Sequence, residues 1–209
     1  FSYSRGIERF NSFNMVVERK SGVYDIIKCV ASDNIEFITD ENNRIYIEGE
    51  IRNRNYSDDT GRHSEIYVFV SSIGKYAGED INFLEFDGFI CQQPVMRRTP
   101  STNRKVTDVL LANNRGNFKS TYVYCLAWGR DAELCGDLRV GCELMIEGRL
   151  QSRTYIKCIG EDTIESRICE ISISSMCVHF NYETEVEFNE ETHYNYCRYS
   201  SIGRYYGSR

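Results

Sequence analysis

The most informative side chains lie in the segment 121–128, where aromatic residues alternate with small or apolar ones. Tyr122, Tyr124 and Trp128 are separated by even numbers of residues, so a β-strand would direct all three rings to one face. Cys125 would then point to the opposite, buried side. An aromatic ring on a wet surface can stack on an unpaired nucleobase of any identity. The spacing therefore favours a base-stacking face, with ordinary core packing as the alternative.

Cations are interleaved with these rings, and each could neutralise a phosphate group, so that binding would weaken as the salt concentration rises. The net charge of the chain is −6, which argues against a protein that binds duplex DNA mainly through its charge. For any single cation, a solvated surface position is the alternative. The candidate phosphate ligands are Arg98, Arg115, Lys119, Arg130, Arg149 and Arg153.

The sequence contains no recognisable catalytic or metal-binding pattern. The three histidines, His63, His179 and His193, are far apart, and neither a P-loop nor a G-x-S-x-G motif occurs. The nine cysteines include no C-x-x-C pair, so we expect reduced, buried thiols in a cytoplasmic protein, with no metal, no cofactor and no enzymatic activity. No apolar run reaches about 18 residues, so no membrane partner is expected.

The chain contains an internal repeat about as long as one small domain. Ile47–Tyr56 aligns with Ile146–Tyr155, and Gly148 follows Gly49 by 99 residues (148 − 49). Identical residues of types Ile, Glu, Gly, Arg and Tyr recur at equal spacing in the two copies. The repeat predicts two domains of one fold in tandem.

The first copy is the less well equipped for stacking. It has Val30 near the place of Trp128 and no Gly-Arg pair after it, so we expect a weaker binding face there. It keeps two candidate stacking residues, Tyr24 and Tyr56. Tyr155 is the repeat counterpart of Tyr56 and is a further candidate.

Alternating apolar residues and Gly/Asn turns predict an all-β protein with one short helix per domain. Five strands with a helix between the third and fourth are typical of the OB barrel, so we expect two tandem five-stranded OB-folds, the first truncated at its N-terminus. In the first copy the expected strands are 12–18, 24–30, 44–56 and 65–71. In the second copy they are 82–91, 106–113, 121–128, 143–155 and 167–175, with a loop at 95–103 and a short helix within 129–137.

The expected domain plan has four parts. Residues 1–76 form the first OB-fold, degenerate or truncated, and 77–81 form a linker. Residues 82–178 form the second OB-fold. Residues 179–209 are rich in Glu, Tyr and Ser without an apolar period, so a disordered tail is expected.

A series of short motifs runs through the second copy: Gly88-Phe89-Ile90-Cys91, Arg97-Arg98-Thr99-Pro100, Ala127-Trp128-Gly129-Arg130 and Ile146-Glu147-Gly148-Arg149. They resemble the bacterial single-stranded DNA-binding proteins, strongly over residues 82–176 and more weakly over 1–76. The whole chain is similar to the form of these proteins found in clostridial-type bacteria, in which one chain carries two OB-folds in tandem. In that family aromatic residues of the barrel face stack on bases, and Tyr122, Trp128 and Tyr155 match three such positions.

The resemblance implies sequence-tolerant binding of single-stranded DNA in replication, recombination and repair, and a homodimer with four OB-folds. Family members usually end in an acidic peptide closing in Pro-Phe that recruits replication and repair proteins, and this chain departs from that pattern at 204–209. Two other functions fit the sequence: an OB-fold scaffold that binds proteins of the replication machinery, and a binder of single-stranded RNA.

Overall fold

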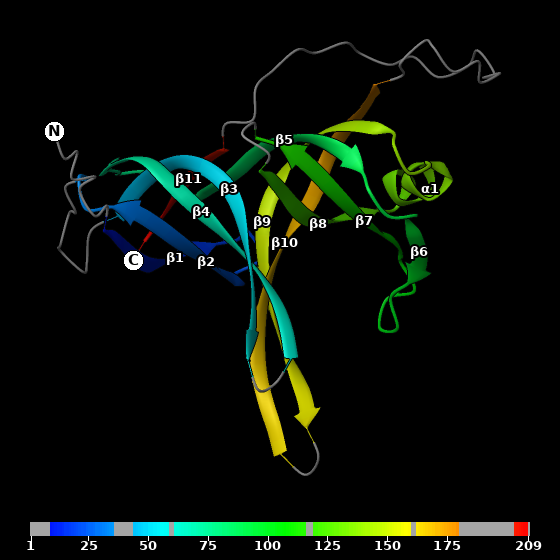
Figure 1. The fold of residues 1–209 in the computed structure, drawn as a ribbon, viewed down its shortest axis with the longest axis horizontal. Coiled ribbons are helices and arrows are strands. Elements are labelled where there is room, and N and C mark those ends of the chain that lie inside the picture. The colour runs from blue at the N-terminus through cyan, green and yellow to red at the C-terminus, as the bar shows by residue number, and fades with distance from the viewer. Residues whose placement is uncertain are drawn as a thin grey trace, which may run out of the picture. The chain divides into compact units, whose positions relative to one another are not determined.

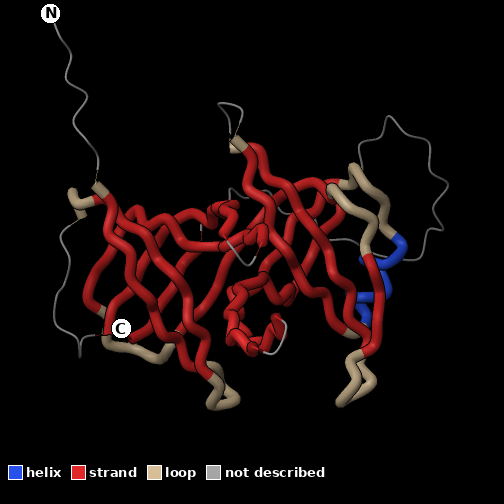
Figure 2. The backbone as a smooth tube through the Cα atoms, turned by 60° about the horizontal axis from the view of Figure 1, so that its bottom comes forward, coloured by secondary structure: helices blue, strands red, loops and turns tan. Residues whose placement is uncertain are grey.

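A computed structural model describes residues 9–35, 44–58, 61–115, 119–159, 162–179 and 203–208. Within these ranges the chain forms eleven strands and one helix, so the expected mostly-β class is confirmed (Figure 2). The helix α1, Arg130–Asp137, lies where the sequence predicted one. No helix is described in the first repeat, of which residues 36–43 lie outside the described ranges.

The chain divides into two compact units that are not continuous in sequence. Unit 1 comprises Phe1–Asn82, Gln151–Cys169 and Gly203–Arg209, and unit 2 comprises Phe83–Leu150 and Glu170–Ile202. The segment 82–178, expected as a single domain, therefore contributes to both units. The reason is that two long paired strands, β9 (Glu143–Ile159) and β10 (Asp162–His179), both labelled in Figure 1, each have residues in both units.

Five strands pair in a closed cycle around the interior of unit 2. The order is β5 (Ile81–Ile90), β7 (Lys105–Asn114), β8 (Ser120–Trp128), β10 and β9, which pairs again with β5. All of these described registers are antiparallel except that of β8 with β10, which is parallel. The interior is filled by large aliphatic side chains that are sealed from solvent: Leu84, Ile90, Leu111, Leu144, Ile146, Leu150 and Ile171.

A further strand, β6 (Val95–Arg98), lies within the segment 95–103, where the sequence predicted only a loop. It pairs antiparallel with β7, from Val95 opposite Asp108 to Arg98 opposite Lys105. All four of its residues are exposed, so no apolar alternation marks it in the sequence. Hydrogen bonding to the edge of β7 stabilises it, which is an interaction between segments.

Unit 1 has a cycle of the same kind. The strands β1 (Phe10–Glu18), β2 (Tyr24–Ser32), β4 (Gly61–Lys75) and β3 (Arg44–Asp58) follow one another, with β2 and β4 parallel. The cycle is closed by β11 (Gly203–Ser208), which pairs with β3 over six residues and with β1 at Val16.

The position of β11 corrects two expectations. Residues 203–208 were expected to belong to a disordered tail, but they form a strand. The first barrel was expected to be truncated, whereas β11 takes the place in its cycle that β5 takes in unit 2, antiparallel to both neighbours. A strand of this kind gains its stability from pairing with β3, so local composition did not reveal it. Residues 180–202 of the expected tail lie outside the described ranges.

Two glycines of the repeat mark the closest approach between neighbouring strands. A Cβ atom on Gly49 would collide with the carbonyl oxygen of Phe69, and one on Gly148 would collide with that of Ser172. The register of β3 against β4 shifts between Glu48 and Gly49, as in a β-bulge. Glycine recurs at this point because neither strand leaves room for a side chain.

Thiols contribute to the interior of both units. Cys29 and Cys125 are sealed from solvent, and this burial raises the pKa of both thiols. Burial also raises the pKa of Cys135 to about 12. The seven cysteines whose side chains the structure describes are free, and Cys91 among them is exposed.

Replacing Gly148 with Ala should lower the free energy of unfolding of unit 2 by about 1–3 kcal/mol, because the added methyl group must displace the backbone of β10. Urea denaturation followed by circular dichroism measures the change. Glu147→Ala, an exposed neighbour on the same strand, serves as the control and should stay within about 0.5 kcal/mol of the wild type. Equal stabilities of the two variants would contradict the proposed role of this glycine.

Deleting residues 203–209 should expose the backbone groups of β1 and β3 that β11 covers. Amide hydrogen exchange should then become faster in β1 and β3 and remain unchanged in β7 and β8. Tyr205→Pro should have a similar effect, because proline removes a donor from the centre of the strand. Unaltered exchange in β1 and β3 would show that β11 does not close the cycle in solution.

Candidate nucleic-acid interface

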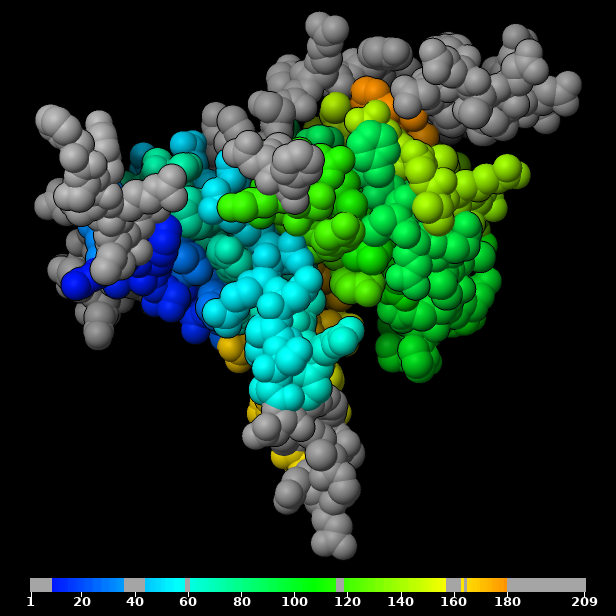
Figure 3. All heavy atoms as spheres, in the orientation of Figure 1, coloured from blue at the N-terminus to red at the C-terminus, as the bar shows by residue number. Residues whose placement is uncertain are grey.

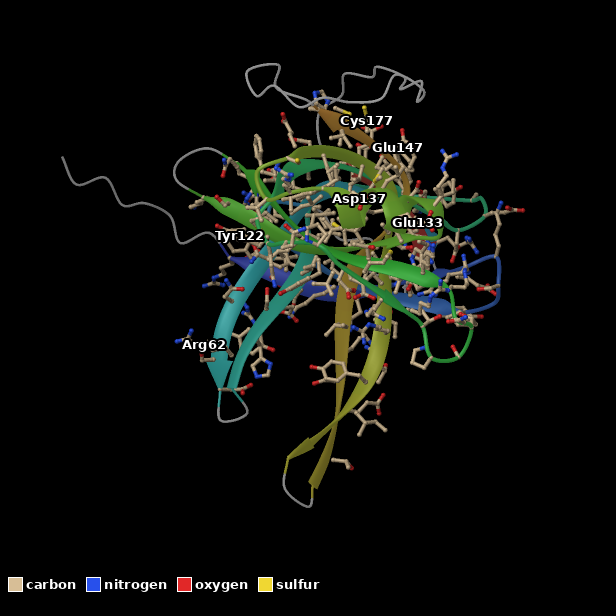
Figure 4. All side chains as sticks on the ribbon, turned by 90° about the vertical axis from the view of Figure 1, so that its right-hand side faces the viewer. Arg62, Tyr122, Glu133, Asp137, Glu147 and Cys177 are labelled. Atoms are coloured by element: carbon tan, nitrogen blue, oxygen red, sulfur yellow. The ribbon has the colours of Figure 1, made fainter. Side chains whose placement is uncertain are left out.

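The outer face of β8 carries the rings that the sequence singled out. Tyr122 is 45% exposed and Tyr124 is 52% exposed, while Trp128 is half-buried on the same side of the strand. Figure 4 labels Tyr122 on β8. The intervening residues Val123 and Cys125 are fully buried, so the inner face of the strand belongs to the core. The rings are therefore a surface feature.

Strand β7 supports this face from one side. Its residue Ala112 lies opposite Tyr122, and Leu110 lies opposite Tyr124. The small and apolar partners leave both phenol rings room to lie across β7. These two strands therefore present an apolar floor with two accessible aromatic rings.

A guanidinium lies close to the indole. The Cζ atom of Arg104 is 5.6 Å from the centroid of the Trp128 ring, a cation–π distance. The sequence places Arg104 among the cations interleaved with the rings but does not predict this contact, because Arg104 precedes β7 and meets the indole only after β7 has paired with β8. No local signal would have identified this contact.

The cations of unit 2 fall into two classes. Asp108 accepts two hydrogen bonds from Arg97, at 2.7 and 3.0 Å, which raise the pKa of Arg97, and Lys105 pairs with Glu133. In contrast, six exposed cations of unit 2 have no carboxylate partner among the described residues: Arg98, Arg104, Arg115, Lys119, Arg130 and Arg139. Four of them, Arg98, Arg115, Lys119 and Arg130, were among the predicted phosphate ligands.

Arg149, which was also predicted, is half-buried on β9 in unit 2. Arg153 is exposed and Tyr155 half-buried further along the same strand, but both belong to unit 1. The structure thus brings Tyr122, Tyr124 and Trp128 together in unit 2 and assigns Arg153 and Tyr155 to unit 1.

The part of β9 in unit 1 is held by a buried carboxylate. Asp25 is fully buried and accepts hydrogen bonds from the Arg19 side chain, at 2.7 and 2.5 Å, and from the backbone N–H of Ser152, at 2.7 Å. The Ser152 hydroxyl in turn accepts a hydrogen bond from the N–H of Ile26. Hydrogen bonding to Asp25 raises the pKa of Arg19. This network fixes β9 against the start of β2.

The outer face of unit 1 differs from that of unit 2. Cys29 lies beside Val68 in the parallel pair of β2 and β4, as Cys125 lies beside Ile171 in unit 2. This register places Ile26, Lys28 and Ser32 at the positions of Tyr122, Tyr124 and Trp128.

The expectation that Val30 lies near the counterpart of Trp128 is therefore off by two residues. The reason is that the sequence alignment matched apolar runs, whereas pairing with the parallel strand sets the true equivalence. Of the tyrosines predicted here, Tyr24 is 56% exposed. Tyr56 is 40% exposed and stacks on His63, with ring centroids 5.0 Å apart.

Two other kinds of site were searched for over the described ranges. They contain no group of three or more His, Cys, Asp or Glu side chains placed to hold a metal ion. Their one helix is too short and polar to span a membrane.

Comparisons with solved structures concern the fold. Two structures of the single-stranded DNA binding protein from Thermus aquaticus resemble this fold at 18% sequence identity. The wild-type protein gives a TM-score of 0.63 over 86% of this chain and 84% of that chain. A deletion mutant gives 0.59 over 88% and 85%. No curated protein sequence matches the chain.

A protein-family model covers the part of the chain that carries the exposed rings. The model is that of the single-strand binding protein family, and it matches residues 81–176. This segment contains β7, β8 and α1, together with the six exposed cations of unit 2 that have no carboxylate partner in the described ranges. Residues 81–176 therefore belong to the single-strand binding protein family.

Proposed function

We propose that this protein binds single-stranded DNA, with little dependence on sequence, on the outer face of β7 and β8. The observation that carries the proposal is the exposure of Tyr122 and Tyr124 on one face of β8, beside Trp128. Buried aromatic rings would have indicated core packing instead. Bases stack on these rings, and the aromatic faces accept any base.

The phosphate backbone is neutralised by cations around this face. Arg98, Arg115, Lys119 and Arg130 are exposed and available to a phosphodiester, and Arg149 is a further candidate on β9. Arg104 keeps positive charge close to Trp128, where a stacked nucleotide would place its phosphate. Binding is passive: the rings and cations hold the strand unpaired without any chemical step.

We further propose that each closed cycle of strands is an OB barrel, so that one chain carries two. Two chains would then form a homodimer with four barrels, as the family resemblance implies. In unit 1, Tyr24, Tyr56, Arg153 and Tyr155 are the candidate ligands. The roles that follow from such binding are in replication, recombination and repair.

Removal of the two exposed rings tests the stacking face. The double variant Tyr122→Ala/Tyr124→Ala should bind labelled oligo-dT at least about tenfold more weakly, because one stacked base contributes roughly 1–3 kcal/mol and 1.4 kcal/mol is about tenfold. Quenching of the Trp128 fluorescence and anisotropy of the labelled strand both report the affinity. Phe83→Ala, which removes an exposed ring from β5, is the control. A double variant that binds like the wild type would refute the assignment of the two tyrosines. In a separate experiment on the wild type, competition between oligo-dT and oligo-rU would measure the preference for DNA over RNA.

The cations are tested through the dependence of affinity on salt. For single strands, each neutralised phosphate contributes about 0.7 to the slope of log K against log salt concentration. The variant Arg115→Gln/Lys119→Gln should therefore reduce the slope by roughly 1.4. Arg139→Gln is the control. It removes an exposed charge from the loop that follows α1, whereas Arg115 and Lys119 precede β8, and it should leave the slope unchanged. If both variants give the wild-type slope, Arg115 and Lys119 do not contact phosphates.

A further inference from the structure

The outer face of unit 1 carries positive charge that is already matched by its own carboxylates. Lys28 on β2 donates to both carboxylate oxygens of Glu65 on β4, at 2.8 and 2.7 Å. Arg54 on β3 lies opposite Glu65 in the antiparallel register and is 3.5 Å from the same carboxylate. Glu65 therefore lies between cations from the strands on either side of it.

The rings of this face are also occupied by side chains of unit 1. The guanidinium of Arg52 lies 3.5 Å from the centroid of the Phe69 ring and is hydrogen-bonded to Glu50 at 2.9 Å. Arg54 lies over Tyr56 at 5.1 Å, on a ring that also stacks on His63. Arg54 thus belongs to both arrangements, because it contacts Glu65 and Tyr56. The outward side chains of β3, cyan in Figure 3, form part of the exposed surface.

Unit 2 differs in part. Its Tyr122 and Tyr124 rings are exposed, and the exposed cations Arg98, Arg115 and Lys119 have no carboxylate partner within the described ranges. The two units share one order of strands, so the difference lies in the side chains and not in the backbone. The position of Glu65 is the clearest case, since Val68 and Ile171 are equivalent and the same spacing places the apolar Ile168 at the corresponding position of β10.

We propose that Glu65 is an internal anion that occupies the phosphate-binding cations of unit 1 and so keeps its affinity for single strands below that of unit 2. The proposal rests on the function proposed above. A carboxylate and a phosphodiester each carry one negative charge and accept hydrogen bonds from the same donors. A phosphate that approaches Lys28 and Arg54 must therefore displace Glu65 or remain next to its charge.

Glu65 competes only partially with a phosphate for Lys28 and Arg54, because all three side chains are partly exposed. The side chains of Lys28 and Glu65 are 33% and 30% exposed, and that of Arg54 is 62% exposed, so water and salt screen their attraction. A single strand can therefore displace the carboxylate at a cost in affinity. Glu65 sets how strongly unit 1 binds without preventing binding.

The test is Glu65→Gln in the Tyr122→Ala/Tyr124→Ala background, which weakens unit 2 and leaves unit 1 as the main site. The amide keeps the size of the side chain and removes its charge. Affinity for oligo-dT should rise about tenfold at low salt, and the salt slope should increase by roughly 0.7–1.4 because one or two cations become available to phosphates. Loss of folding cannot produce such a gain.

Glu79→Gln is the matched control, because it makes the same change of charge at an exposed residue of unit 1 that has no ion pair within the described ranges. Adding Lys28→Gln to the Glu65→Gln variant should remove most of the gain. If Glu65→Gln raises the affinity no more than Glu79→Gln, or lowers it, the inference is overturned while the proposed function stands. If the unmodified chain does not bind oligo-dT, the proposed function itself is wrong.

Discussion

The parallel pairing of β8 with β10 is the constraint on which the candidate interface depends. Cys125 lies beside Ile171, and both are sealed from solvent in the interior of unit 2. Because side chains alternate along a strand, this pairing forces Tyr122 and Tyr124 outward. A slip of one residue would turn the rings inward and expose the buried residues between them. The packing that fills the interior therefore also creates the exposed aromatic surface.

Unit 1 shows that the same strand order can support a different surface. Ile26, Lys28 and Ser32 stand where unit 2 has its two tyrosines and its tryptophan. Rings occur in unit 1 at other places, such as Phe69 on β4, and there the guanidinium of Arg52 covers them. Two units with one backbone arrangement thus differ in how much of their aromatic and cationic surface is available to a ligand, since function resides in the site and not in the fold.

The order of strands in space differs from their order in the sequence of unit 1. β11 lies in the cycle between β3 and β1, although 23 residues separate it from the end of β10 (180–202). A closed cycle leaves no free strand edge, and free edges favour association with other chains. Closure by a distant segment costs conformational entropy, because the chain between the two strands is closed into a loop. The pairing of six residues of β11 with β3 must offset this cost.

The sequence by itself determined the strand class, the repeat and the placing of Tyr122, Tyr124 and Trp128 on one face of a strand, because the alternation of side chains and the recurrence of Gly49 and Gly148 are patterns of the local sequence. It favoured an exposed face for the rings over core packing without deciding between them. It did not determine that β11 closes unit 1 or that β9 continues into that unit, because these depend on pairing between distant segments. The equivalence of Trp128 with Ser32 and the contact of Glu65 with Lys28 and Arg54 likewise followed only from the register between strands. Register is decided by the tertiary structure, since it is the packing of the whole interior that selects one alignment of neighbouring strands over another.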